Sequence, residues 1–515
     1  MIAAILCMAA TQSLANVSSI VMPEGGRVMD ASTIDVDGDG SSDMLIASVN
    51  GTTRTISIHL RRATGAAFTS TADASLDLQQ DVVCFAAGDV HADLGREIVL
   101  FNANGAFVWR WRESEESRRV AKLAACELLW QWPDRLTAFA WQSAITDVDG
   151  DGLDDLTVPE PNRLRVLFQR RGEDGKCSFD VQQVLVPGDS DSGGRALDFD
   201  RAAEVRQAGT KRRTRMAVTS GGVQIDGDRD GVGPYLWIQE NVPAPQIVDF
   251  DGDGDRDVLF LENDALVVFT QSSAGVFANE PLRLKSPVPV TRARELDVSY
   301  LAKSLDLDGD QRVDCVFSAG DKRSKDVRTQ VLVFLSKFVK TGEAALFGNE
   351  GTPSQLLLLD GFARPIGFED VDGDGKPDFV AGAVKPDLID GLRAAASERI
   401  DAELYVYKNT GVGFSKRPDL VHKISIQAGG LDLVARFLGD VTGDGVADFF
   451  ERADKSLLKV HMVRRTRDGL TVVEKPIFEW PLEADARLLL PRRLGAGSWD
   501  VFAIEKEAVR CASFR

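Results

Sequence analysis

The chain has few of the residues on which many enzymes and disulfide-bonded proteins depend. Its 515 residues include only four histidines and six cysteines, and no two cysteines form a CxxC pair. The spacing therefore indicates neither a disulfide framework nor a zinc site, although a single bridge between Cys84 and Cys126 stays open. Cys315 is expected to be a core thiol. No GxSxG, HExxH or phosphate-binding glycine loop occurs, so these common catalytic motifs are absent.

Long apolar runs and an excess of basic residues are also lacking. No hydrophobic stretch reaches the length of a membrane span, and 44% hydrophobic residues are typical of a globular chain. With 79 acidic and 60 basic side chains the formal net charge is −19. Nucleic acid binding therefore has no positive support.

The acidic residues are concentrated in a phrase of nine residues that occurs six times. The copies are DVDGDGSSD (35–43), DVDGDGLDD (147–155), DFDGDGDRD (249–257), DLDGDQRVD (306–314), DVDGDGKPD (370–378) and DVTGDGVAD (440–448). Each copy runs directly into apolar, β-prone residues. Recurrence at a spacing of tens of residues is typical of a repeat architecture.

The spacing within each copy is suited to calcium. Ca²⁺ takes six to eight oxygen ligands, which a tight loop supplies from alternate side chains and a backbone carbonyl. Clustered carboxylates repel one another unless a cation lies among them. The expected carboxylate ligands, at relative positions 1, 3, 5 and 9, are Asp35, Asp37, Asp39 and Asp43; Asp147, Asp149, Asp151 and Asp155; Asp249, Asp251, Asp253 and Asp257; Asp306, Asp308, Asp310 and Asp314; Asp370, Asp372, Asp374 and Asp378; and Asp440, Asp444 and Asp448.

Two further details complete the six expected calcium sites. The residue at position 7 would offer its backbone carbonyl; these residues are Ser41, Leu153, Asp255, Arg312, Lys376 and Val446. In the last copy Thr442 replaces the carboxylate at position 3, which should weaken that site. Gln311 replaces the second glycine of the copy at 306–314, so that turn is expected to be less tight.

Two other interpretations compete with a calcium-binding repeat. A single DxDGDG could be an acidic surface turn, but six copies in one phase argue against this. The EF-hand loop needs a bidentate Glu at position 12 between two helices. Five copies have another residue there, and although the last has Glu451, its flanks are also β-like.

The segments around each copy predict an all-β chain of four-stranded blades. Alternating strands such as TISIHLRR from Thr55 and ELYVYKN from Glu403 follow each loop, and several units contain Gly followed by Phe. A further copy has lost part of the motif but keeps Asp89, Asp93 and Glu97, so it could bind a cation weakly; such incomplete copies are called decayed. Another decayed copy lies around 198–218. A third aligns Asp500 with Asp448. Eight blades in one β-propeller are favoured and seven are the alternative, with the strand from Asn16 closing the ring.

The chain resembles the FG-GAP/VCBS repeat family, the calcium-binding propeller units of integrin α-subunits and of many secreted bacterial proteins. The resemblance extends over nearly the whole chain and rests on the six Asp-rich loops. It implies a β-propeller with calcium in these loops, and integrin-like adhesion as one function of such a module. It does not identify a partner, because propellers serve many unrelated functions.

The N-terminus predicts export. Residues 1–15 contain a short apolar core and a small-residue cleavage site before Asn16, so they are interpreted as a signal peptide and 16–515 as the propeller. Secretion, or location in the cell envelope, agrees with calcium binding, because extracellular calcium would keep such loops filled.

Four tryptophans stand apart from the repeat. Trp109, Trp111, Trp130 and Trp132 alternate in two segments, which packing between blades would explain; an exposed patch would instead be a partner-binding site. His59 and His461 occupy matching strand positions and are expected on strand surfaces. The stretch IDGDRDG at 225–231 is interpreted as a turn.

We therefore expect a secreted calcium-binding propeller, not an enzyme, that recognises an extracellular or envelope protein or a glycan. Two alternatives remain: a calcium-dependent, lyase-like enzyme acting on polysaccharides on the same scaffold, and a passive module of the cell envelope.

Overall fold

The computed structural model describes most of the chain outside a few loops and one long insertion. The described residues are 15–63, 66–91, 95–102, 104–113, 120–126, 138–141, 144–160, 163–172, 177–185, 223–226, 235–238, 246–261, 265–272, 275–285, 296–299, 306–310, 312–321, 328–335, 353–384, 399–427, 435–454, 456–489 and 499–514. These residues form strands and turns, and they contain no α-helix. They accordingly include no helix long and apolar enough to cross a membrane.

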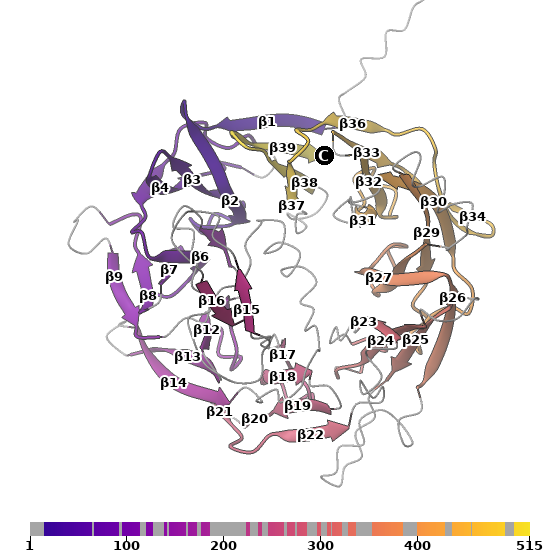
Figure 1. Ribbon diagram of the computed structural model, residues 1–515, viewed down its shortest axis with the longest axis horizontal. Helices are drawn as coiled ribbons and strands as arrows, with labels where there is room; N and C mark the ends of the chain where they lie inside the picture. Colours follow the sequence, from indigo (N-terminus) through magenta and orange to yellow (C-terminus); the bar gives the residue numbers. More distant parts are fainter. Residues whose placement is uncertain are drawn as a thin grey trace, which may run out of the picture.

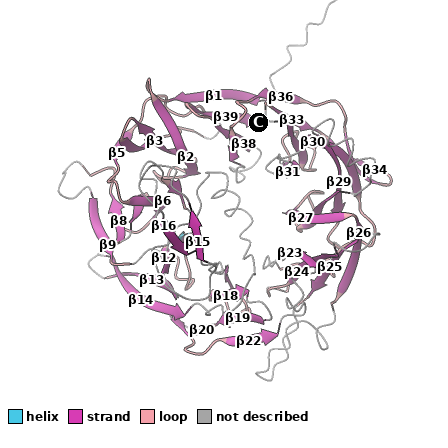
Figure 2. Cartoon of the chain, in the orientation of Figure 1, coloured by secondary structure: helices cyan, strands magenta, loops and turns pink. Residues whose placement is uncertain are grey.

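The strands form a closed ring of eight blades, which confirms the predicted propeller and the favoured blade number (Figure 1). Each blade contains four antiparallel strands, the first of which lies toward the centre of the ring, and blade 2 adds a short fifth strand. The Asp-rich loops connect the first and second strands of their blades. Because all blades have the same direction, these loops lie on one face of the ring. Figure 2 shows that the ring is built from strands and loops alone.

The first four blades follow the chain from its N-terminal end. Their strands are, in blade 1, β2 (Gly26–Ile34), β3 (Asp43–Asn50), β4 (Thr53–His59) and β5 (Ala74–Asp77); in blade 2, β6 (Val82–Gly88), β7 (Glu97–Asn102), β8 (Gly105–Trp109) and β9 (Val120–Ala124), with β10 (Phe139–Ala140) added parallel to β6; in blade 3, β11 (Ile145–Thr146), β12 (Asp155–Glu160), β13 (Arg163–Arg171) and β14 (Cys177–Leu185); and in blade 4, β17 (Gln246–Val248), β18 (Asp257–Leu261), β19 (Ala265–Phe269) and β22 (Leu282–Lys285).

The remaining blades complete the circle. Their strands are, in blade 5, β23 (Leu296–Ser299), β24 (Cys315–Asp321), β25 (Arg328–Phe334) and β26 (Gln355–Asp360); in blade 6, β27 (Phe362–Glu369), β28 (Asp378–Val384), β29 (Arg399–Tyr407) and β30 (Leu420–Gln427); in blade 7, β31 (Ala435–Gly439), β32 (Asp448–Asp454), β33 (Leu457–His461) and β36 (Phe478–Pro481); and in blade 8, β37 (Arg487–Leu489), β38 (Trp499–Ile504), β39 (Ala508–Phe514) and β1 (Ala15–Val21).

Blade 8 closes the ring by joining the two ends of the chain, as the sequence predicted. The N-terminal strand β1 pairs antiparallel with β39, from Ala15 opposite Phe514 to Val21 opposite Ala508. It forms the outermost strand of the last blade (Figure 1). Seven residue pairs therefore hold the ring shut without a covalent bond.

The remaining strands form two-stranded hairpins outside the eight sheets. These are β15 (Val223–Asp226) with β16 (Tyr235–Ile238), β20 (Gln271–Ser272) with β21 (Val276–Phe277), and β34 (Val463–Thr466) with β35 (Gly469–Val472). The hairpin of β15 and β16 lies on the inner side of the ring (Figure 1). The decayed copy predicted around 198–218 lies outside the described residues, as does most of the IDGDRDG stretch.

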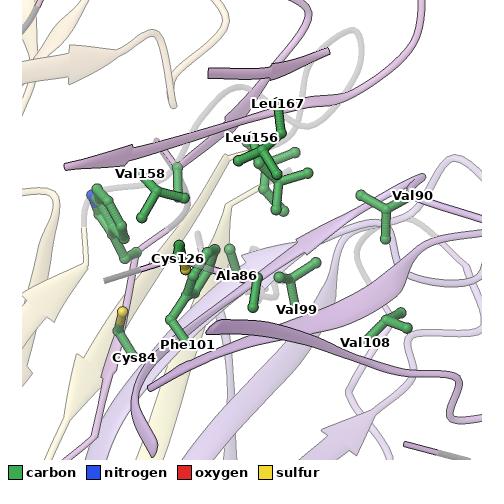
Figure 3. Packing of buried hydrophobic residues seen from close by; sticks show 14 of the residues in the cluster. Cys84, Ala86, Val90, Val99, Phe101, Val108, Cys126, Leu156, Val158 and Leu167 are labelled. Atoms are coloured by element: carbon green, nitrogen blue, oxygen red, sulfur yellow. The ribbon is translucent and has the colours of Figure 1, made fainter. Parts of the chain in front are cut away.

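The core is divided into clusters between neighbouring blades. The cluster between blades 2 and 3 combines Val99 and Val108 with Leu156, Val158 and Leu167, all nearly or completely buried (Figure 3). The period-two alternation of the strands produces this packing, because each strand has one face toward each adjacent blade. Burial of such side chains is the main stabilising contribution to the ring.

The cysteines and histidines correct two expectations. Cys84 and Cys126 are both buried in the cluster of Figure 3, yet both are free thiols, so the bridge left open by the sequence is not formed. Cys315 is a buried core thiol, as expected. His59 and His461 do occupy matching registers, opposite Met44 and Phe449. They are buried, however, and each Nδ1 contacts a backbone carbonyl, at 2.8 and 3.0 Å.

A buried ion pair joins blade 1 to blade 8. The guanidinium of Arg61, which follows β4, donates to the carboxylate of Asp500 on β38, and both side chains are at most 1% exposed. Arg61 also lies over the ring of Phe68, 4.1 Å from its centroid. Removing one partner from such a pair leaves the other charge buried without compensation.

We predict that Arg61→Met lowers the free energy of unfolding by about 3–5 kcal/mol, because Asp500 loses its counter-charge inside the ring closure. Denaturant unfolding of the full chain measures this. Arg62→Met is the matched control, since Arg62 is 68% exposed and pairs with Asp73 at the surface; it should cost less than about 1 kcal/mol. Equal losses in the two variants would contradict a role of the buried pair in closing the ring.

Candidate metal centre

The aspartate at position 1 folds each acidic loop around its own carboxylate. In the first loop Asp35 accepts the amides of Gly38 at 2.7 Å and Gly40 at 2.9 Å. Asp147, Asp249 and Asp440 accept the corresponding two amides at 2.5–3.0 Å. The position-5 aspartate accepts the amide of position 7 in all six loops, for example Ser41 to Asp39 at 2.7 Å. In their described residues the six loops therefore share this position-5 to position-7 contact.

The aspartate at position 9 fixes the loop to its blade. It begins the second strand, is fully buried, and accepts the amide of position 2 and the amide of a residue near or just beyond the end of the third strand. Asp155 thus accepts Val148 and Gln169, both at 2.8 Å. Asp43, Asp257, Asp378 and Asp448 make the same pair of contacts, with Arg61, Gln271, Asn409 and Val463 as the donors after the third strand.

Burial makes ionisation of these carboxylates unfavourable. It raises the pKa of Asp155 and Asp257 to about 7, although the donated amides lower it. The pKa values of Asp43, Asp378 and Asp448 are raised to about 6 for the same reason. A nearby cation would favour the ionised form, so the loops are electrostatically prepared for one.

Five loops bring three carboxylate oxygens within 4.8 Å of one another. These groups are Asp35, Asp37 and Asp39; Asp147, Asp149 and Asp155; Asp249, Asp251 and Asp257; Asp306, Asp308 and Asp314; and Asp370, Asp372 and Asp374. In the sixth loop the Thr442 hydroxyl contacts Asp440 at 3.4 Å and Asp448 at 3.5 Å, in the place of the missing carboxylate.

Two buried oxygens in these loops have no hydrogen-bond donor. They are Oδ1 of Asp149 and Oδ1 of Asp251, both at position 3, and the Asp149 side chain is only 4% exposed. An unpaired, buried carboxylate oxygen is costly unless a cation binds to it. The donor set consists entirely of hard oxygens, which fits Ca²⁺.

Neighbouring loops are connected directly. The position-2 carbonyl of one loop accepts the position-8 amide of the next: Val36 from Arg96 at 2.8 Å, Val148 from Arg256 at 3.1 Å, and Val371 from Ala447 at 2.9 Å. Glycines meet at the same junctions, where Gly373 lies against the carbonyl of Gly445. The acidic loops therefore form an interlocked band on one face of the ring.

The decayed second copy retains only part of this arrangement. Glu97 takes the place of the position-9 aspartate and accepts the amide of Val90 at 3.2 Å. Asp89 is paired instead with Arg171 of the next blade, at 2.9 Å. Asp93 lies outside the described residues, so its predicted weak cation site stays a prediction.

The tryptophan residues support packing between blades. Trp109 is fully buried in the cluster between blades 1 and 2, which agrees with packing between blades and rules out the alternative of an exposed partner-binding residue at this position. Trp111 packs against the same cluster and donates its Nε1 to the Arg96 carbonyl at 3.0 Å, with Arg112 stacked on its ring. Trp130 and Trp132 lie outside the described residues.

Two basic side chains in the loops were missed by sequence reasoning. Arg170 Nη1 lies 2.7 Å from Asp149 and 3.2 Å from Asp151, and Lys408 Nζ bonds to Asp372 and lies 3.1 Å from Asp374. Burial favours a higher pKa for Asp374, but the hydrogen bond from Lys408 and further donors outweigh it, and the pKa is lowered. In the sequence, both basic residues are recognisable only as direct neighbours of the residue that donates its backbone amide to the position-9 aspartate.

No family model matches the chain, and no curated protein matches it significantly. Among solved structures, Sqt1 from Chaetomium thermophilum is 9% identical, with 96% of this chain and 99% of that chain covered and a TM-score of 0.38. A lectin from Agrocybe aegerita, which recognises non-reducing terminal N-acetylglucosamine, is 15% identical with 76% and 79% covered and a TM-score of 0.34. BBS1N, solved in complex with ARL6DN, is 9% identical with 85% and 94% covered and a TM-score of 0.32. Similarities of this size assign neither a family nor a function to the chain.

We predict that Gly373→Ala destabilises the ring more than Gly375→Ala. Both glycines have positive φ, so either substitution costs about 1–2 kcal/mol of backbone strain. A Cβ at Gly373 would also overlap the carbonyl oxygen of Gly445, whereas a Cβ at Gly375 meets open space. The overlap should add about 1–3 kcal/mol, measured by denaturant unfolding. The same loss in both variants would show that neighbouring loops are not in contact.

Proposed function

We propose that the protein is a calcium-stabilised recognition module of the FG-GAP/VCBS type. Calcium would be held in the six Asp-rich loops by the carboxylates at positions 1, 3, 5 and 9, with Thr442 in the sixth loop, and by the position-7 carbonyl. When bound, the ion would neutralise the clustered carboxylates. It would thereby stabilise the band of loops on one face of the ring.

The observation that carries this proposal is the pair of unpaired buried oxygens, Asp149 Oδ1 and Asp251 Oδ1. Each belongs to a group of three carboxylates whose oxygens are within 4.8 Å. In these two loops the amides satisfy the position-1 and position-9 carboxylates, while Oδ1 of the position-3 carboxylate has no donor. A cation in the loop supplies that partner.

The recognition role is proposed from the architecture of the chain. A rigid ring whose loops are fixed by metal and by contacts between blades offers a preformed surface, which lowers the entropic cost of binding a protein or a glycan. We propose that the partner is extracellular or in the cell envelope. The predicted leader and the calcium-dependent loops support this location.

We predict that chelation lowers the melting temperature by many degrees and that calcium restores it, because ligand binding to the folded state adds to stability. Differential scanning calorimetry with EDTA, and then with excess calcium, measures this. Magnesium is the control, since its smaller ion demands near-ideal octahedral geometry. A well-folded, calcium-free protein by elemental analysis, with unchanged melting in EDTA, would contradict the proposal.

Recognition is tested separately, by applying the calcium-loaded protein to glycan arrays and to envelope extracts. Specific capture of one glycan class or one protein supports a recognition module. The appearance of unsaturated ends in an acidic glycan would instead assign lyase chemistry to the scaffold. No specific capture from either source would favour a passive envelope module.

A further inference from the structure

In two acidic loops, a basic side chain from another part of the chain lies between two of the carboxylates. Arg170, near the end of β13, spans Asp149 and Asp151, with its Nη1 at 2.7 and 3.2 Å from their carboxylate oxygens. Lys408, directly after β29, spans Asp372 and Asp374 in the same manner. In both loops the bridged carboxylates occupy positions 3 and 5, which are two of the expected calcium ligands.

The two cations reach this position from different places in the chain. Gln169 and Asn409 are equivalent residues, because each donates its amide to the position-9 aspartate. Arg170 follows the first of them and Lys408 precedes the second. Two unrelated positions therefore place a positive charge, once from an arginine and once from a lysine, beside the carboxylates at positions 3 and 5.

The loop at 249–257 has no such cation at either place. Its equivalent residue is Gln271, which is preceded by Thr270 and followed by Ser272. Neither neighbour carries a charge, so these two positions supply no counter-cation to the carboxylates of Asp251 and Asp253. In blade 7 the residue equivalent to Arg170 is Arg464, but it contacts the Met462 sulfur at 3.1 Å instead of the loop carboxylates.

We propose that Arg170 and Lys408 are built-in counter-cations that compete with calcium, so that the loops at 147–155 and 370–378 form a lower-affinity class than the loop at 249–257. This inference rests on the proposed calcium binding. Both side chains are about one-third exposed, Arg170 at 31% and Lys408 at 39%, so they can leave the loop for solvent when an ion enters. At low calcium they keep their loops compensated, and the ring stays folded.

Displacing the Arg170 or Lys408 side chain lowers the calcium affinity of its loop. A calcium ion needs the oxygens of positions 3 and 5, and these oxygens must first be released from a charge-assisted hydrogen bond. Such a bond is strong enough to reduce the affinity of its loop by about tenfold. Removing the cation should restore that affinity without changing the number of sites.

The test is calcium titration of the full chain in competition with a chromophoric chelator. Lys408→Met and Arg170→Met should each shift one site to about tenfold tighter binding, and Thr270→Lys should shift one site to weaker binding. Arg464→Met is the matched control, because it removes the same charge at an equivalent place outside the loops. In EDTA, Lys408→Met should also have a lower melting temperature than the wild type, and added calcium should restore that temperature.

The outcomes separate this inference from the proposed function. If the wild type binds calcium and Lys408→Met and Arg170→Met titrate like Arg464→Met, the counter-cation inference is overturned while calcium binding stands. If the wild type binds no calcium at all, both are overturned.

Discussion

The fold depends on one buried contact, the position-9 aspartate that accepts two amides from different parts of its blade. Asp155 shows the pattern, with Val148 of the loop and Gln169 near the end of the third strand as donors. This contact sets the loop against the sheet, so every other ligand position follows from it. It also places a carboxylate where water cannot solvate it, which raises its pKa and creates the need for positive charge nearby.

The blades meet that need in different ways. In the loop at 249–257 the carboxylate of Asp251 has a buried oxygen without a donor, whereas Arg170 and Lys408 place a positive charge of the chain beside the carboxylates of their loops. Blade 8 uses a third way, because its position-9 equivalent, Asp500, pairs with the buried guanidinium of Arg61. Within a single ring, the blades therefore differ in whether a basic side chain of the chain lies beside the clustered carboxylates.

Much of this architecture could be predicted from sequence. The D-x-D-G-D phrase recurs with a fixed phase, so it defines the loops, the strands that follow and the closing strand from Asn16. The cations could not be predicted, because Arg170 and Lys408 are distant in sequence from the carboxylates that they bind and their positions differ. Trp109 was uncertain for a similar reason, since alternation places it on one strand face but does not say which element covers that face.

The residue that donates its amide to the position-9 aspartate also connects the blades. The side chain of Gln271 reaches the Val148 carbonyl of the preceding blade at 3.1 Å, and that of Asn409 reaches the Leu307 carbonyl at 2.9 Å. Arg61 is equivalent to both, and the blade that precedes it around the ring is blade 8. The closing ion pair therefore uses the equivalent donor residue, but its acceptor is the carboxylate of Asp500 instead of a position-2 carbonyl. Because blade 8 unites the two chain ends by strand pairing without a covalent bond, the charged form of this inter-blade contact lies at the junction that closes the ring.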